Sequence, residues 1–337
     1  MKNPFVTNGY VSPEYFCDRE KETAKIVSLL TNENNIALIS PRRLGKTDLL
    51  RHCFGQPEIK EHYHTFIIDI YATSSVRDFV NVFGKAVLDE LRPKGKSVWG
   101  TFLNVLAYLR SEITFDMNGQ PTWGIGLGAI TNPSATLDEI FSYLNNAGKP
   151  CLIAIDEFQQ ITKYADDPNI EAALRTHIQR CSNAHFVFSG SHRHLMGAMF
   201  TSPARPFYQS VTLINLPPIS VDKYAEFCLK HFERVSKHLD TLVVTELYER
   251  FNGITSYMQK VMNILFSMTG TGEICIPSMI DTAINDLLDF SADTYDALLY
   301  QMPEKQRIVF MAIAAEGKAK AISSGDFVRK YKLQSAS

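Results

Sequence analysis

Short apolar runs alternate with helical patterns through the N-terminal part of the chain. Five runs have the length and composition of buried strands, at 36–39, 65–71, 151–157, 185–189 and 210–214. Between them apolar positions recur at helical spacing, notably at 75–91, 137–145 and 169–180, and a further helix is predicted from about residue 17 to 30. Strands that alternate with helices predict an α/β fold in which helices cover both faces of a parallel sheet.

One segment interrupts this alternation. Residues 112–125 contain two short β-like runs around Asn118-Gly119. Asn-Gly between such runs is a strong signal for a tight hairpin turn. We therefore expect a β-hairpin insertion, at about 111–128, between the second and third strands of the sheet.

After Pro217-Pro218 the pattern becomes helical. Helices are predicted at 221–235, 240–251, 255–268 and 277–289, and we interpret them as a small all-α lid. Further helices are predicted from Pro303 to about 315 and from a Ser324 cap to about 331, followed by a turn at 333–337. This resembles the front half of a helix-turn-helix. The expected domains are 1–219, 220–298 and 299–337, the last either incomplete or packed on the lid.

The most specific motif follows the first strand. A glycine-containing turn, Lys46-Thr47 and a helical pattern succeed one another, which is the P-loop arrangement. Backbone N–H groups of such a turn and the helix N-terminus can hold a di- or triphosphate. Lys46 would reach the β- and γ-phosphates, and the Thr47 hydroxyl would ligate Mg²⁺. Ser40 replaces the usual first glycine. The candidate nucleotide-binding residues are Ser40, Pro41, Arg42, Arg43, Leu44, Gly45, Lys46, Thr47 and Asp48.

Two carboxylates follow the third predicted strand. Asp156 and Glu157 end an apolar run, so they are expected at the carboxyl edge of the sheet, where ligands bind in open α/β folds. Asp156 would hold Mg²⁺ directly or through water, and Glu157 would orient and polarise the attacking water.

Composition narrows the function further. A net charge of −2 gives no global field that favours nucleic acid. The six cysteines lie far apart without a CxxC motif, so we interpret them as reduced, mostly buried thiols of a cytoplasmic protein. No apolar run has the length of a membrane span, and the N-terminus lacks the apolar core of a signal peptide.

With these residues in place, the chain resembles the archaeal-type ATPases, which are AAA+-like members of the STAND P-loop NTPases. The resemblance covers nearly the whole chain. The segments that carry it are 16–20, 41–47, 155–159, 188–191 and 251–253. It implies a three-layer sheet of strand order 5-1-4-3-2, ATP and Mg²⁺ as cofactors, slow or regulated hydrolysis, a helical lid and a C-terminal winged helix.

Further roles follow from the resemblance alone. Ser189 or Ser191 would sense the γ-phosphate, although either serine also suits a turn at a strand end. Arg193 and Arg205 are the candidates for an arginine finger, with Arg175 and Arg180 weaker, although most arginines are solvated surface charges or salt-bridge partners. Arg19 would lie near the adenine or pair with Glu22. Relatives commonly have Gly-x-Pro in the lid, where this chain has Gly253-Ile254-Thr255.

Several alternatives stay open. Arg42 and Arg43 can clamp phosphate, or they can bind the lid or a neighbouring subunit. A slow nucleotide-dependent switch that exposes a protein-binding surface competes with a working ATPase. Residues 302–337 carry seven basic and three acidic side chains, which fits either DNA contact or a solvated face. No Asn-Lys-x-Asp motif suggests a GTPase, and Glu157 favours water over the substrate hydroxyl of a small-molecule kinase.

Overall fold

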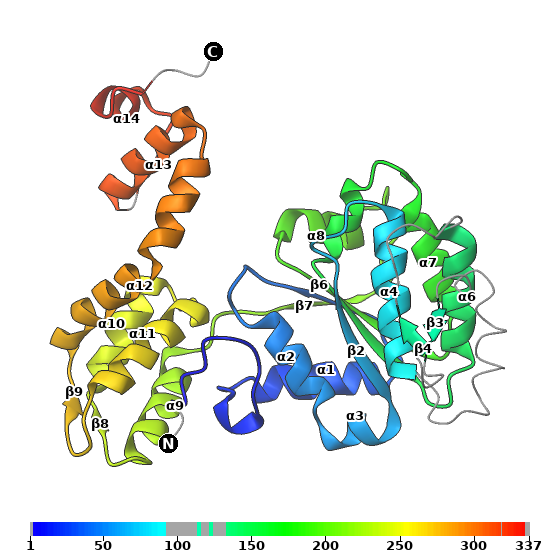
Figure 1. Ribbon diagram of the computed structural model, residues 1–337, viewed down its shortest axis with the longest axis horizontal. Coiled ribbons are helices and arrows are strands. Elements are labelled where there is room, and N and C mark those ends of the chain that lie inside the picture. The colour runs from blue at the N-terminus through cyan, green and yellow to red at the C-terminus, as the bar shows by residue number, and fades with distance from the viewer. Residues whose placement is uncertain (1–2, 92–112, 116–120, 124–132, 318, 334–337) are drawn as a thin grey trace. The chain divides into compact units, whose positions relative to one another are not determined.

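The computed structural model describes residues 3–91, 113–115, 121–123, 133–317 and 319–333. It divides into two compact units, Met1–Cys275 and Ile276–Ser337, and each is described by itself. The first unit contains a five-stranded sheet and the helices that follow it in the sequence (Figure 1).

The sheet is parallel throughout, with spatial order β2–β5–β6–β1–β7. Numbered along the chain as five sheet strands, this is the predicted order 5-1-4-3-2 seen from the other edge, and the prediction is confirmed. The bounds are β1 (Ile36–Ile39), β2 (His64–Asp69), β5 (Cys151–Asp156), β6 (Ala184–Gly190) and β7 (Thr212–Asn215).

Helices cover both faces of the sheet, which confirms the predicted three layers (Figure 1). Ile36 and Leu38 of β1 pack on the face of α1 (Glu20–Thr31), α2 (Lys46–Phe54) and α3 (Pro57–His62). Ala37 and Ile39 point to the other face, because successive strand side chains alternate. That face is covered by α4 (Val76–Leu91), α6 (Pro133–Asn145), α7 (Ile170–Arg180) and α8 (Arg193–Thr201).

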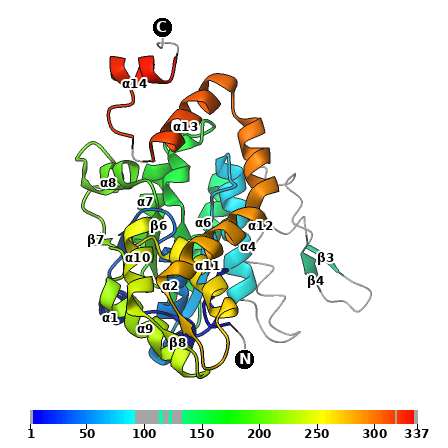
Figure 2. The same ribbon diagram turned by 90° about the vertical axis from the view of Figure 1, so that its left-hand side faces the viewer.

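The predicted hairpin insertion is confirmed in its strands. β3 (Ile113–Phe115) pairs antiparallel with β4 (Pro121–Trp123), between β2 and β5 in sequence (Figure 2). The rest of the predicted segment, 111–112, 116–120 and 124–128, lies outside the described residues.

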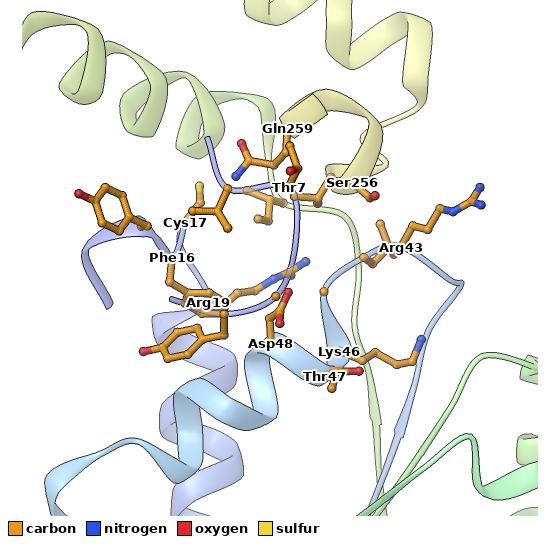
Figure 3. Close-up of a pocket in the computed structure, with 18 of the residues that line it drawn as sticks. Thr7, Phe16, Cys17, Arg19, Arg43, Lys46, Thr47, Asp48, Ser256 and Gln259 are labelled. Atoms are coloured by element: carbon orange, nitrogen blue, oxygen red, sulfur yellow. The ribbon is translucent and has the colours of Figure 1, made fainter. Parts of the chain in front are cut away.

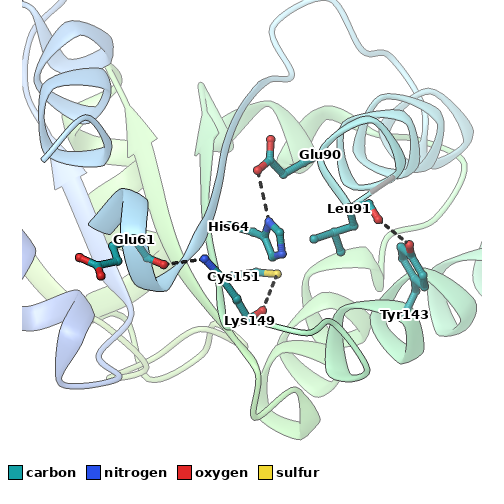
Figure 4. Close-up of polar contacts among 7 residues, drawn as sticks. All are labelled: Glu61, His64, Glu90, Leu91, Tyr143, Lys149 and Cys151. Carbon is teal, nitrogen blue, oxygen red and sulfur yellow. Dashed lines mark hydrogen bonds and ion pairs between the residues drawn. The ribbon is translucent and has the colours of Figure 1, made fainter. Parts of the chain in front are cut away.

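Side-chain to backbone hydrogen bonds tie down the segments on either side of this insertion (Figure 4). The Tyr143 hydroxyl of α6 donates to the carbonyl oxygen of Leu91, the last residue of α4, at 2.9 Å. Burial raises the pKa of Tyr143 to about 12, so the phenol keeps its proton at neutral pH. Lys149 donates to the carbonyl oxygen of Glu61 near the end of α3, at 2.6 Å, where a cation also complements the helix dipole.

The helices after the sheet correspond to the predicted lid, and that name is kept for them below. They are α9 (Val221–Glu233), α10 (Thr241–Phe251) and α11 (Thr255–Met268), with a short parallel pair of β8 (His238–Leu239) and β9 (Ile274–Cys275). The N-terminal Phe5 is fully buried among their rings, against Phe227, Phe232 and Phe266. The first residues of the chain therefore belong to the core of the lid.

The second unit begins with a 3₁₀ turn, Pro277–Met279, followed by α12 (Ile280–Gln301), α13 (Glu304–Glu316) and α14 (Gly325–Lys330). Ser324 caps α14 as predicted, accepting from Phe327 N at 3.3 Å. The expected helix end at residue 289 is wrong, because α12 meets neither glycine nor proline before Pro303. The expected 298/299 boundary falls inside α12, and residues 334–337 of the predicted terminal turn are not described.

All six cysteines are buried and none forms a disulfide, as expected for structural thiols. Burial raises the pKa of Cys17, Cys53 and Cys151 to about 12, so these thiols stay protonated. Among the described residues, no helix has both the length and the apolar character needed to cross a membrane.

Phe188 provides a test of this core. Its side chain is 1% exposed, and its ring lies 4.4 to 6.1 Å from those of Phe158, Phe186, Phe200 and Phe207. Phe188→Ala should lower the free energy of unfolding by about 3–5 kcal/mol, because it leaves a cavity among rigid rings. Urea titration followed by circular dichroism measures this. Leu242→Ala, at a position 61% exposed on α10, is the control and should cost less than about 0.5 kcal/mol. Equal losses would contradict the assignment.

Candidate functional site

The loop between β1 and α2 has the backbone form of an anion-binding turn. Arg43 and Gly45 adopt left-handed conformations, with φ of 69° and 82°, just before α2 begins at Lys46. The helix then presents its unpaired N-terminal amides and the positive end of its dipole at the loop. Ser40, which replaces the usual glycine, is not among the residues with positive φ, so a side chain there strains no backbone.

Lys46 lies beneath this loop with its side chain folded back. Its Nζ donates to the carbonyl oxygens of Ser40 and Pro41, at 3.1 and 3.2 Å. The residue is 7% exposed, and burial lowers the pKa of its ammonium while Asp156 and Glu157 oppose that shift. The nearby carboxylates thus favour a charged lysine in a poorly solvated position, which strengthens its attraction for an anion.

The parallel register brings Thr47 and Asp156 together across 109 residues. Asp156 ends β5, and its Oδ2 accepts a hydrogen bond from the Thr47 hydroxyl at the start of α2. The hydroxyl and carboxylate predicted to share a metal are therefore in direct contact.

Glu157 is held by polar partners from neighbouring elements. It has a left-handed backbone, φ 55°, immediately after β5. Its Oε2 accepts hydrogen bonds from Ser191 Oγ at 2.9 Å and from Gln159 Nε2. Arg42 Nε in turn donates to Ser191 Oγ at 3.3 Å. The carboxylate, the serine and the loop arginine therefore form one network.

The candidate sensor and finger residues are placed differently from one another. Ser191 joins the Glu157 network, whereas Ser189 is fully buried and its hydroxyl has no partner among the described residues. Arg193 is exposed as the first residue of α8, and Arg205 pairs with Glu171. Neither arginine lines the cavity described next, and their roles stay predictions.

A cavity of about 320 Å³ adjoins the loop (Figure 3). Lys46 and Thr47 lie toward one end of it, and Thr7 and Gln259 lie toward the other. Most of the predicted binding residues line it, with Arg19 and Asp48, while Ser40 and Pro41 touch Lys46 instead. Burial raises the pKa of Asp48, opposed by Arg51. Asp156 and Glu157 also line the cavity, and the other walls are Val6, Thr7, Gly9, Tyr10, Val11, Tyr15, Phe16, Cys17, Ile219, Thr255, Ser256 and Gln259.

Sequence patterns do not predict most of the lining residues that lie outside the phosphate loop. The segment 6–15 has neither a helical nor a strand period, and only Phe16 and Cys17 belong to a recognised motif. Thr255, Ser256 and Gln259 share one face at the start of α11 and come from the lid. The Gly253-Ile254-Thr255 sequence that leads into this helix was the signal in the sequence that pointed to a lid contribution.

The two loop arginines use different partners. Arg43 lies over the Tyr257 ring, 4.9 Å from its centroid, and donates to the Tyr257 hydroxyl. The Arg43 carbonyl oxygen also accepts from Ser256 N at 3.2 Å. Arg43 thus binds the lid, which was one of the alternatives, while Arg42 lies 5.5 Å from the centre of the Tyr71 ring.

Arg19 lines the cavity but is already paired. Its Nη1 donates to Glu22 at 2.8 Å and its Nη2 donates to the Pro217 carbonyl oxygen at 2.7 Å. Asp18 and Arg19 are both left-handed, which turns the chain sharply into α1. At 3% exposure, Arg19 fixes the N-terminal wall against the segment leading to the lid.

Comparison with known proteins agrees with this arrangement. Residues 16–261 match the family described as "ATPase domain predominantly from Archaea", and residues 293–337 match one described as "Probable winged helix domain". No curated protein matches the sequence.

Two solved structures share the fold along nearly the whole chain. The Walker-type ATPase Paby2304 of Pyrococcus abyssi is 16% identical, covering 98% of this chain and 93% of that one, with a TM-score of 0.59. The ORC2 protein of Aeropyrum pernix, in ADPNP–ADP complexes, is 14% identical, covering 98% and 82%, also with a TM-score of 0.59. At such identities the likeness concerns the fold alone.

Gly190 tests the packing behind the Glu157 network. A Cβ at this position would lie 2.4 Å from Gln159 Oε1 and 2.6 Å from the Met196 side chain. Gly190→Ala should therefore cost about 1–3 kcal/mol in the free energy of unfolding by urea titration. Gly197→Ala on α8 is the matched control, because nothing lies within 4 Å of its added Cβ. It should be neutral or stabilising by up to about 1 kcal/mol. A neutral Gly190→Ala would contradict the close packing.

Proposed function

Since the chain belongs to the family of ATPase domains found predominantly in Archaea, and is therefore an ATPase, we propose that the cavity beside the phosphate loop binds ATP with Mg²⁺ and hydrolyses it with water as the nucleophile. The observation that carries this proposal is the meeting of Lys46, Thr47, Asp156 and Glu157 along that cavity. The polar end of the cavity would take the triphosphate, and the walls from the N-terminal segment and the lid would take the nucleoside.

The loop supplies the positive charge that a triphosphate needs. Backbone amides at the start of α2 would bind phosphate oxygens, and Lys46 would exchange the two loop carbonyls that it now contacts for phosphate. Arg42 is exposed and linked to Ser191, so it can reach a terminal phosphate from the solvent side.

The donor set of Thr47 and Asp156 suits Mg²⁺. Hydroxyl and carboxylate oxygens are the hard ligands that this ion prefers, and the two side chains are already in contact. Both residues would hold the ion, which would neutralise charge on the phosphate oxygens when bound.

Glu157 is the group that would act on water. A carboxylate there can accept a proton from the nucleophile, or orient it by a hydrogen bond. Ser191 and Gln159 fix one carboxylate oxygen, Oε2, and neither of these two side chains donates to Oε1. Oε1 is therefore the oxygen that we assign to the water. The Ser191 hydroxyl, which contacts the carboxylate, would link the position of Glu157 to the presence of the γ-phosphate.

Closure of the lid would couple to this chemistry through Arg43. The arginine belongs to the phosphate loop, yet its partners Ser256 and Tyr257 belong to α11. A phosphate that repositions the loop would change this contact. The same contact supports a second candidate function, a slow nucleotide-dependent switch in which the lid position matters more than turnover.

Glu157→Gln and Lys46→Ala test the proposal together. Glu157→Gln should keep ATP affinity within about threefold while turnover falls at least about 100-fold, since the base is lost and the phosphate contacts stay. Lys46→Ala should lose both binding and turnover. Calorimetry and phosphate release on the same samples measure these effects.

The outcomes separate the two candidate functions. Wild-type turnover above about 1 s⁻¹ without partners would favour the working ATPase, and slower turnover would favour the switch. Unchanged affinity and turnover in Lys46→Ala would contradict the site itself.

We further propose that residues 293–337 contact DNA. The match of this segment to a winged helix family and the basic excess of residues 302–337 support the proposal. The ORC1 protein of Aeropyrum pernix, solved in complex with DNA, shares the fold at 13% identity and a TM-score of 0.55, covering 96% of this chain and 81% of that one.

The proposed DNA contact predicts salt-sensitive binding. The full chain should bind a labelled DNA duplex at about 50 mM salt and lose at least about tenfold in affinity at 200 mM, because binding releases counterions. Fluorescence anisotropy measures this. Absence of binding at the lower salt would contradict it.

A further inference from the structure

Gln259 places a buried amide at the end of the cavity remote from the phosphate loop (Figure 3). The residue is only 9% exposed, and it lies on α11 four residues after Thr255, on the same face. In Figure 3 its side chain lies beside Thr7, while Lys46 and Thr47 lie at the opposite end. Any ligand that is anchored by its phosphates at the loop would therefore bring its other end toward this amide.

Tyr224 fixes which way the amide points. The Tyr224 hydroxyl, itself on a residue 1% exposed, donates to Gln259 Oε1 at 2.9 Å. This assigns the oxygen to Tyr224 and leaves the Nε2 group as the free end. Among the described residues, Nε2 donates no hydrogen bond. Nε2 is therefore available as a donor, and a ligand that accepts from it would gain one hydrogen bond.

The cavity walls outside the phosphate loop suit a flat ring with a polar edge. Val6, Phe16 and Ile219 give the cavity apolar surface. Phe16 is held in place by stacking on His52, with ring centroids 4.4 Å apart. Apolar walls with a few placed polar groups are typical of a site that binds an aromatic ligand and fixes its orientation.

We propose that Gln259 reads the nucleobase, its Nε2 donating a hydrogen bond to a ring nitrogen of adenine. This inference rests on the proposed function, because it needs a nucleotide anchored at the phosphate loop. It also supplies a lid contact with the base in a chain that lacks the proline of the Gly-x-Pro pattern. Tyr224 acts as a positioning residue, since it touches the amide and not the base.

Deaza analogues of ATP test the contact atom by atom. Each analogue replaces one ring nitrogen, N1, N3 or N7, with C–H and so removes one acceptor. Calorimetry should show that one of the three binds the wild-type chain about tenfold more weakly than ATP, which corresponds to one lost hydrogen bond. The Gln259→Leu variant should bind ATP about tenfold more weakly than the wild type does. This variant should bind that same analogue as tightly as it binds ATP.

Two further variants separate reading of the base from general damage. Tyr224→Phe should reduce the discrimination between ATP and that analogue without abolishing it, because the amide loses its orientation. Gln179→Leu, which removes an exposed amide on α7 away from the cavity, should behave as the wild type. Thermal unfolding of each variant confirms that it is folded.

The failure of this inference can be told from failure of the proposed function. If the wild-type chain binds no ATP, the nucleotide site is wrong and the inference falls with it. If the wild type binds ATP but the preference for ATP over every analogue is the same in Gln259→Leu, the site stands and base reading by Gln259 is overturned.

Discussion

The parallel register of β1, β5 and β6 is the constraint on which the site depends. Parallel strands end at one edge of the sheet, so the loop after β1, the acids after β5 and the serine after β6 meet there. A slip of one residue would turn the side chains to the other face and separate Asp156 from Thr47. The rings around Phe158 and Phe188 resist that slip by filling one face of the sheet.

The electrostatics of the site follow from this convergence. Two carboxylates and Lys46 lie close together in a poorly solvated region, and the backbone amides of α2 add positive potential. Such a cluster of buried charges is stable only when each charged group is paired or hydrogen-bonded. One oxygen of Glu157 accepts two hydrogen bonds, and one oxygen of Asp156 accepts a hydrogen bond from the Thr47 hydroxyl. The polar groups are thus held in place before any ligand arrives, which reduces the cost of organising them.

Residues of the lid and of the N-terminal segment form the cavity walls that the edge of the sheet does not supply. Phe5 packs in the lid core, and the segment from Val6 to Cys17 then runs along the cavity. Arg19 attaches this segment to Pro217, and Arg43 attaches the phosphate loop to α11. Movement of the lid would therefore alter both walls of the nucleoside end together. This shared dependence is the physical basis on which nucleotide state and lid position would be coupled.

Local patterns in the sequence were sufficient for most of the fold and for the polar end of the site. The strands, the hairpin, the phosphate loop and the acids Asp156 and Glu157 each follow from residues that are neighbours in the chain. Only the tertiary structure decided that Ser191, and not Ser189, reaches Glu157, and that Arg43 contacts Tyr257, 214 residues away. It also placed Gln259 and several residues of the segment 6–15 on the cavity wall. These features depend on contacts between distant segments, and such contacts leave no periodicity or spacing in the sequence from which they can be read.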